Sequence, residues 1–438
     1  MNDSRQMAIS QAALFAGAKA SHADRLSTVP VAWISTIAAV SICVSCAYRY
    51  AIAFPVTDDW AFAVNALLIE RGSWSELIWH INGHPTIAPF LVFWPMAELS
   101  HYDSRCMIGV TILCFALQLL LFQRVSGARG IELLPAALLL FGLSHWMEYQ
   151  WGILMTLAMG QTAAMWALFW FNRFLTNQQA QPLALSILLA AVSIGSYAAG
   201  PTCLAAAMVL TILRPNSFWL KFSALTLLAV LFTTSYFAVQ KALYVFDLTK
   251  VALYLLSSIG ALTIGSDVAI LISGWSLLAS IGVISALVTV AALLAAGWRL
   301  RCESEAFFAS GIFLSLVSMA AVALSRTYMG NWHVQLGLPV LLGMYGLWLC
   351  NFRQRPQSWF QKSGTAAGAA ILCATLIGDY QTLTVRAPAF RTYLGWIESY
   401  SLNYDPQASK PYPPPVPKWD INPEILAFLK SKGHSSFK

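Results

Sequence analysis

The stretch SRCMIGVTILCFALQLLLFQ, residues 104–123, decides the fold class of this chain. Its only charged residue is Arg105, and a helix of this length measures about 30 Å, the thickness of the hydrocarbon core of a bilayer. Apolar runs of similar length recur between residues 31 and 378. The sequence therefore predicts a chain of helices that cross a membrane.

The composition supports the same class. Hydrophobic residues make up 58% of the chain and charged residues 10%, whereas soluble domains have about 45–50% and about 25%. No soluble fold can bury that much apolar surface, so we expect an all-α polytopic membrane protein with membrane lipids around it. The net charge of +7 sits in short basic clusters between apolar runs, which does not favour a nucleic-acid partner.

Hydropathy predicts about eleven transmembrane helices. The expected spans are residues 31–50, 104–123, 132–147, 155–172, 182–197, 200–213, 222–241, 270–297, 306–324, 334–350 and 363–379.

The positions of lysine and arginine predict the orientation, because cytoplasmic loops are enriched in both. One alternation places nearly all of the basic loop clusters on the cytoplasmic side. These cations are Arg5, Lys19, Arg25, Arg124, Arg129, Arg173, Arg214, Lys221, Arg299, Arg301, Arg353, Arg355 and Lys362. The N-terminus is then cytoplasmic, and an odd number of spans places the C-terminus outside.

Three parts follow from this topology. Residues 1–30 form a cytoplasmic tail, residues 31–379 the transmembrane domain, and residues 380–438 a short external tail. The first external loop, residues 52–103, is apolar but interrupted by glycine and proline, so we expect short helices lying on or dipping into the outer leaflet. In the external tail, a proline-rich stretch at 411–417 precedes a small amphipathic helix at 422–429.

The first external loop also carries the most informative polar residues. Asp58 and Asp59 follow the first span, and Asn82 and His84 come about twenty residues later. Placing such polar groups near a membrane costs free energy unless water hydrates them or they serve a function. Two interpretations stay open: a hydrated loop that ends a helix, or a carboxylate that takes a proton from an acceptor hydroxyl beside a neighbour that orients substrate or holds a divalent metal.

Two further polar clusters fall on the same predicted side. The first, SHWMEYQWG at residues 144–152, contains Glu148, and its aromatic residues are also typical of an interfacial belt. The second, SRTYMGNWH at residues 325–333, contains Arg326, Tyr328 and His333. An external arginine opposes the positive-inside bias, so we expect it to face either a phosphate or a carboxylate of this chain. Together the three clusters predict one outward-facing cavity.

At these residues the chain resembles the C-type superfamily of integral membrane glycosyltransferases, and most closely bacterial members of it. The shared features are Asp58-Asp59-Trp60, Asn82-Gly83-His84-Pro85, Glu148-Tyr149-Gln150-Trp151-Gly152, Ser325-Arg326-Thr327-Tyr328 and a Leu429-Lys430 to Phe437 ending, in the same order along the chain.

The resemblance implies transfer of a sugar from a polyprenyl-phosphate donor to a glycan, lipid or protein acceptor on the outer face of a bacterial inner membrane. Asp58 or Asp59 would be the general base of an inverting transfer, and Arg326 would stabilise the leaving phosphate. His84, Asn82, Glu148, Tyr328 and His333 would contact substrate. No cofactor is required, although Asp59 and Glu148 are candidate ligands for Mg²⁺ or Mn²⁺.

Two other functions stay open. A transporter or flippase of a lipid-linked glycan needs polar groups or broken helices within the bilayer, and the segment at residues 195–201 is a candidate break. A non-catalytic assembly protein is also compatible, because Pro85 stands where the resembled loops have an arginine.

Overall fold

A computed structural model of the chain describes residues 22–55, 59–73, 80–81, 84–197, 199–214, 218–239, 303–325, 331–354, 359–402 and 423–437, with isolated helical positions at 249, 252 and 255. For some residues within these ranges, the backbone alone is described. The span predicted at residues 270–297 lies outside the described residues, and so does the proline-rich stretch at 411–417.

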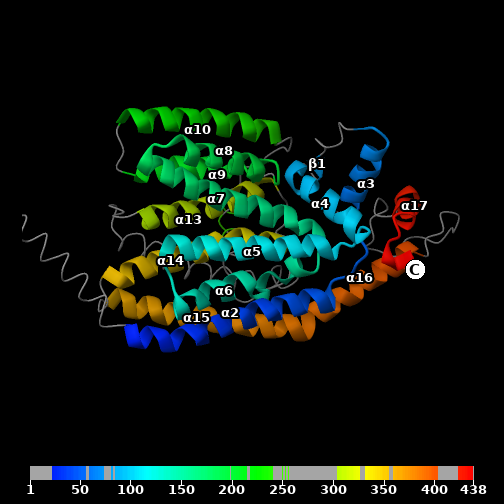
Figure 1. Cartoon of the computed structure of the whole chain (residues 1–438), viewed down its shortest axis with the longest axis horizontal. Coiled ribbons are helices and arrows are strands. Elements are labelled where there is room, and N and C mark those ends of the chain that lie inside the picture. Colours follow the sequence, from blue (N-terminus) through cyan, green and yellow to red (C-terminus); the bar gives the residue numbers. More distant parts are fainter. Residues whose placement is uncertain are drawn as a thin grey trace, which may run out of the picture.

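The described chain is helical apart from one two-residue ladder. Most helices run side by side along the long axis of the molecule (Figure 1). They are α2 (His22–Tyr50), α5 (Arg105–Ser126), α6 (Leu134–Phe141), α7 (Met155–Asn177), α8 (Ala180–Ile194), α9 (Thr202–Leu213), α10 (Phe218–Val239), α13 (Glu303–Ser325), α14 (Leu338–Gln354) and α15 (Trp359–Gln381). Helix α7 is central, because it packs against α5, α8, α9 and α13.

Within the described residues, three helical stretches are long and apolar enough to cross a membrane: Arg105–Ser126, Gly152–Asn177 and Glu303–Leu324. Shorter apolar helices surround them. The outer surfaces of these helices expose large apolar side chains, such as Leu188 at 61% and Ile212 at 59%. Exposing a broad apolar surface to water is unfavourable, whereas contact with lipid chains is not. The all-helical class is thus confirmed and the apolar helices suggest a membrane protein, while the number of eleven spans stays a prediction.

The first and third predicted spans differ clearly from the helices of the structure. Helix α2 begins at His22, so helical structure reaches into the predicted N-terminal tail. The span predicted at 132–147 is not one helix, because α6 ends at Phe141 and extended backbone at Gly142 separates it from the 3-10 helix η3 (Leu143–Tyr149). A Cβ on Gly142 would lie 2.4 Å from the carbonyl oxygen of Leu138, so only glycine fits this turn without a shift.

No helix ends at residue 379, where we expected the external tail to begin. Helix α15 continues through a π-helical turn, η6 (Thr382–Arg386), into α16 (Ala387–Leu402). The predicted amphipathic helix at 422–429 is present as α17 (Pro423–Ser431).

One end of the bundle is covered by the described part of residues 52–103, which we predicted to be the first external loop, and by the C-terminal segment (Figure 1). The loop forms α3 (Asp59–Glu70), α4 (Ile87–Ser100) and an antiparallel ladder of β1 (His80–Ile81) with β2 (His84–Pro85). The expected short helices are therefore confirmed, whereas the ladder was not expected. The backbone N–H of Ala88 donates to the carbonyl of Gly195, which joins α4 to the turn between α8 and α9.

The opposite end brings together loops that we predicted to be cytoplasmic. Arg214 donates to Thr176 at 2.7 Å and pairs with Glu303 at 3.4 Å. Thr176 also donates to the Glu303 carboxylate at 2.6 Å. These contacts tie the ends of α7 and α9 to the start of α13.

Candidate functional site

Asp59 is the predicted catalytic residue whose contacts the structure describes. It is the first residue of α3, and its side chain is only 2% exposed. One carboxylate oxygen, Oδ1, accepts the backbone N–H of Ile153 at 2.6 Å. Ile153 lies in the 3-10 helix η4 (Gly152–Leu154), which continues as α7.

This contact has a clear physical reason. The first N–H groups of a helix have no intrahelical acceptor, and the helix dipole favours a negative charge beside them. Asp59 satisfies one of these donors from a distant part of the chain. A hydrogen bond of this kind to a charged group contributes about 1.5–3 kcal/mol. One oxygen of Asp59 is therefore used to join the first external loop to α7.

The described parts of the three predicted polar clusters lie at this end of the bundle. Helix η3, which carries the second cluster, packs against η5 (Asn331–Gly337), which carries part of the third. The Gln161 amide on α7 donates to the carbonyl of Gln335 in η5 at 3.1 Å. Since Asp59 joins the first cluster to the start of α7, segments far apart in sequence surround one helix end.

The other predicted site residues fall largely outside the described part. Asp58, Asn82, Arg326 and Tyr328 lie outside the described residues. For His84 in β2, Glu148 in η3 and His333 in η5, the backbone is described and the side chains are not. The predicted catalytic role of Asp58 and the predicted substrate contacts of the other six residues therefore stay predictions.

Helix η3 is held by residues that the sequence analysis did not select for the site. The Leu143 N–H donates to Oδ1 of Asp379 at 2.6 Å, and Thr382 donates to the Leu143 carbonyl at 3.3 Å. Within η3, the Tyr149 hydroxyl lies 3.0 Å from both the Leu140 carbonyl and Nε2 of His145. Asp379 therefore fixes a turn at the site, and its position at the end of an apolar run gave no indication of this.

Gln150 is a second residue that the sequence analysis did not select. It is 2% exposed, and among the described residues neither its amide nitrogen nor its amide oxygen has a hydrogen-bond partner. Trp60, next to Asp59, likewise has a buried indole N–H without a described partner. Buried polar groups are normally satisfied, so these atoms are candidates for a hydrogen bond to water or to a polar ligand.

A small cavity of about 20 Å³, lined mostly by apolar atoms, lies between α7, the α8–α9 turn, α13 and η5. Thr202 and Ser318 hydrogen-bond each other at 2.6 Å on its wall, and Gln161 and Ser193 contribute polar atoms without a described partner. A cavity of this size holds about one water molecule. It is too small for a sugar, so a substrate would have to bind nearer to Asp59.

The described residues offer few side chains that could bind a metal ion. They contain no group of three or more His, Cys, Asp and Glu side chains placed to hold a metal ion. Asp59 already has one oxygen in the contact with Ile153. The side chain of the other candidate ligand, Glu148, is not described, so the Mg²⁺ or Mn²⁺ site stays a prediction.

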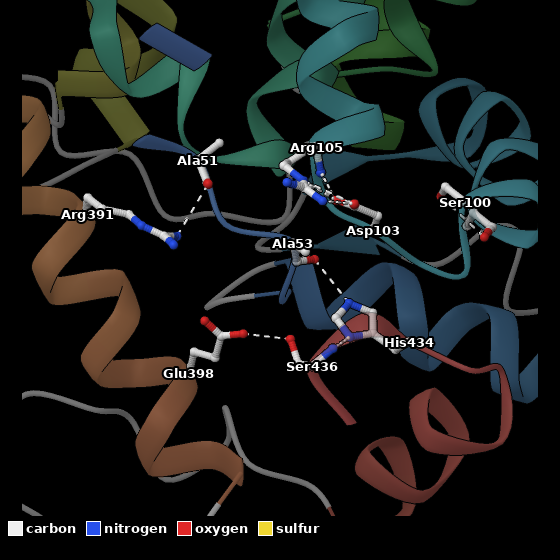
Figure 2. A network of polar contacts seen from close by, with 10 residues as sticks. Ala51, Ala53, Ser100, Asp103, Arg105, Arg391, Glu398, His434 and Ser436 are labelled. Carbon is white, nitrogen blue, oxygen red and sulfur yellow. Dashed lines mark hydrogen bonds and ion pairs between the residues drawn. The ribbon is translucent and has the colours of Figure 1, made fainter. Parts of the chain in front are cut away.

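The C-terminal segment fastens the backbone just before the Asp58-Asp59 pair (Figure 2). His434 Nε2 lies 3.1 Å from the carbonyl of Ala53, and Ser436 donates its backbone N–H to His434 Nδ1 at 3.2 Å. Ser436 also donates its hydroxyl to Glu398 on α16 at 2.6 Å. From the same helix, Arg391 donates to the carbonyl of Ala51 at 3.3 Å.

A second set of contacts holds this segment to α3 and α4. The ammonium of Lys432 pairs with Glu70 on α3 and, at 3.0 Å, with Glu98 on α4. Burial alone would lower the pKa of Lys432, but its hydrogen bonds and the charges of Glu70 and Glu98 raise it above the ordinary value. The predicted external tail is therefore docked onto the first external loop.

Comparison of the chain with protein-family models, curated proteins and solved structures finds no match. The resemblance to membrane glycosyltransferases thus rests on the residues quoted above.

Proposed function

We propose that the chain is a membrane glycosyltransferase that moves a sugar from a polyprenyl-phosphate donor to an acceptor hydroxyl at the external face. The observation that carries this proposal is the meeting of the three polar clusters around the start of α7, with Asp59 joining the first external loop to Ile153. A lipid-linked donor requires a site at the membrane surface with access for its chain between helices. A bundle end capped by short helices is suited to this.

The two aspartates are assigned different roles. Asp59 is a positioning residue, because its Oδ1 is bound to the helix end at Ile153 and its side chain is buried. Asp58 directly precedes it and is the general base. Fixing Asp59 at the start of α3 limits where Asp58 can lie, which is the kind of preorganisation that general-base catalysis needs.

The proposed reaction is a single inverting displacement. The acceptor hydroxyl oxygen attacks the anomeric carbon of the sugar while the bond from that carbon to the phosphate oxygen breaks. The polyprenyl phosphate leaves with the electron pair, and the hydroxyl proton passes to Asp58. Arg326 stabilises the negative charge that grows on the leaving phosphate, with Tyr328, His333, His84, Asn82 and Glu148 as contacts to donor and acceptor.

A sugar-transfer assay tests this proposal. Purified protein in membranes would receive a panel of polyprenyl-phosphate sugars with a mixed acceptor extract, and product would be followed by mass spectrometry. Transfer that yields free polyprenyl phosphate and an inverted anomeric centre supports the proposal. Absence of transfer from every donor in a broad panel would contradict it.

One observation favours transport of a lipid-linked glycan instead. The chain is non-helical between α8 and α9, and the small cavity beside this break includes Ser193, Thr202 and Ser318 in its lining. Translocation of a fluorescent lipid-linked sugar across vesicles without any covalent change would identify this second function. Transfer and translocation therefore give different products.

A further inference from the structure

Two arginines lie against one aromatic ring at the end of the bundle opposite the candidate site. The guanidinium carbon of Arg124 is 5.5 Å from the centroid of the Phe169 ring, and that of Arg173 is 5.6 Å from the same centroid. Arg124 is in the last turn of α5, and Arg173 is near the end of α7. Phe169 itself is buried, whereas both arginines are exposed.

Neither arginine is neutralised by a carboxylate of the described chain. The ion pairs among the described residues involve Arg71, Arg105, Arg214 and Lys432. At this end of the bundle, Glu132 accepts the backbone N–H of Arg129, Glu303 pairs with Arg214, and Glu305 is buried in α13. Two cations on one ring repel each other, so the arrangement favours an anion between or beside them.

The ring that holds the arginines is part of an ordered aromatic stripe. Trp166, Phe169, Trp170 and Arg173 follow helical spacing on α7, and Phe169 contacts both tryptophans edge-on at 5.6 and 5.2 Å. Trp166 donates its indole N–H to the Leu117 carbonyl at 3.3 Å, which fastens this stripe to α5. The stripe runs from Trp166 near the middle of α7 to Arg173 in its last turns, so it leads from the apolar part of the helix toward the end where headgroups lie.

An exposed apolar stripe leads away from the arginines along α5. Leu113, Leu117 and Leu120 are 58%, 38% and 50% exposed, and with Arg124 they follow one face of the helix. A ligand that contacts the guanidinium groups can therefore extend an acyl chain along these leucines toward the centre of the bundle. This continuity favours a lipid over a soluble phosphate.

We propose that Arg124 and Arg173, held against Phe169, bind the phosphate group of an anionic phospholipid in the leaflet at this end of the bundle. Each guanidinium offers planar N–H donors that match phosphate oxygens. The site is separate from the candidate transfer site and does not depend on the proposed function. Its occupant joins α5 to α7 through the headgroup and covers the exposed leucines of α5.

Native mass spectrometry of the full chain tests the site with phosphatidylglycerol as the probe and phosphatidylcholine as the zwitterionic comparison. Since each interfacial arginine adds about 1 kcal/mol toward an anionic lipid, we expect the wild type to prefer phosphatidylglycerol by roughly thirtyfold. The double variant Arg124→Gln/Arg173→Gln should lose this preference. Variant Arg124→Lys/Arg173→Lys keeps the charge and should retain part of it.

Arg49→Gln is the matched control. Arg49 is also exposed and lies 5.5 Å from an aromatic ring, that of Tyr50, but in the last turn of α2 at the other end. It should leave the preference unchanged. Equal binding of the two lipids by the wild type, retention of the preference in the folded glutamine double variant, or displacement of the lipid by millimolar inorganic phosphate would overturn the proposal.

Discussion

Asp59 and Ile153, far apart in sequence, are joined by a hydrogen bond of 2.6 Å from the Ile153 backbone N–H to the Asp59 carboxylate. This bond places the start of α3 beside the start of α7. We assign Asp59 a structural role on this ground, and we propose that its neighbour Asp58 is the general base. Variants of Asp59, Asp58 and the residues around them can separate these two roles.

Replacing Asp59 should destabilise the fold. Asp59→Ala leaves a buried helix-end N–H without its acceptor, so we expect a loss of about 1.5–3 kcal/mol in the free energy of unfolding. Asp59→Asn keeps an acceptor oxygen and should lose less. Thermal unfolding in detergent measures both. Glu424→Gln is the control, because Glu424 forms an exposed pair with Arg71 that contributes little. An unchanged melting temperature in Asp59→Ala would exclude the structural role.

Gly142 should tolerate no side chain. In Gly142→Ala, the new Cβ would lie 2.4 Å from the Leu138 carbonyl, so the break between α6 and η3 must shift. We expect a cost of about 1–3 kcal/mol, typical of overpacking. Gly109→Ala on α5 is matched to it, since a Cβ there meets no atom within 4 Å. Thermal unfolding should show a loss for position 142 and none for position 109. Equal melting temperatures for the two variants would contradict this reason for the break.

Lys432 should hold the C-terminal segment on the first external loop. Lys432→Met removes the ion pairs with Glu70 and Glu98, so hydrogen exchange should become faster both in residues 423–437 and in α3. Lys430→Met is the control, because Lys430 is exposed and no hydrogen bond or ion pair is described for its side chain. If the two variants exchange alike, the Lys432 pairs do not hold this contact.

His434 should make that docking sensitive to acid. Burial lowers the pKa of His434 from its ordinary value of about 6.5, and the charges of Asp103, Glu398 and Arg105 act on it more weakly. The docked segment thus favours the neutral ring, with Nδ1 accepting the Ser436 N–H. The stabilisation is full above the unfolded pKa and is lost as the pH falls below about 6.5 through the folded value.

Hydrogen exchange of residues 423–437 at pH 7.5 and pH 5, corrected for the intrinsic rate, measures this effect. Protection should fall at the lower pH in the wild type. The variant His434→Gln cannot titrate and should show a smaller change. The same loss of protection in both proteins would mean that another group controls the docking.

Long apolar runs could be predicted from the sequence because hydropathy is a local property. The helices at 105–126 and 303–325 agree with their predicted spans within a few residues. The break at Gly142 was missed, because it depends on the distance from its Cβ position to a carbonyl, which hydropathy does not report. The helix through residue 379 was likewise unexpected, since its more polar continuation is typical of a chain leaving the membrane.

The site was harder to predict for a physical reason. The contacts of Asp59 with Ile153 and of Lys432 with Glu70 join residues that are 94 and 362 positions apart. Polar residues in a membrane chain stand out in the sequence because placing them near a bilayer costs free energy, and the three clusters could be predicted for this reason. Their partners cannot be recognised in this way, so the structural tasks of Asp59, Asp379 and the C-terminal segment became visible only in the fold.

The most direct test of the proposed function is the rate of sugar transfer per folded molecule in wild type, Asp58→Asn and Asp59→Asn. We predict transfer by the wild type, a loss of roughly 10²–10⁴-fold in Asp58→Asn with normal thermal stability, and a lower yield of folded protein in Asp59→Asn whose folded fraction still transfers. Wild-type transfer that persists undiminished in Asp58→Asn, or no transfer by the wild type from any polyprenyl-phosphate donor, would contradict the account.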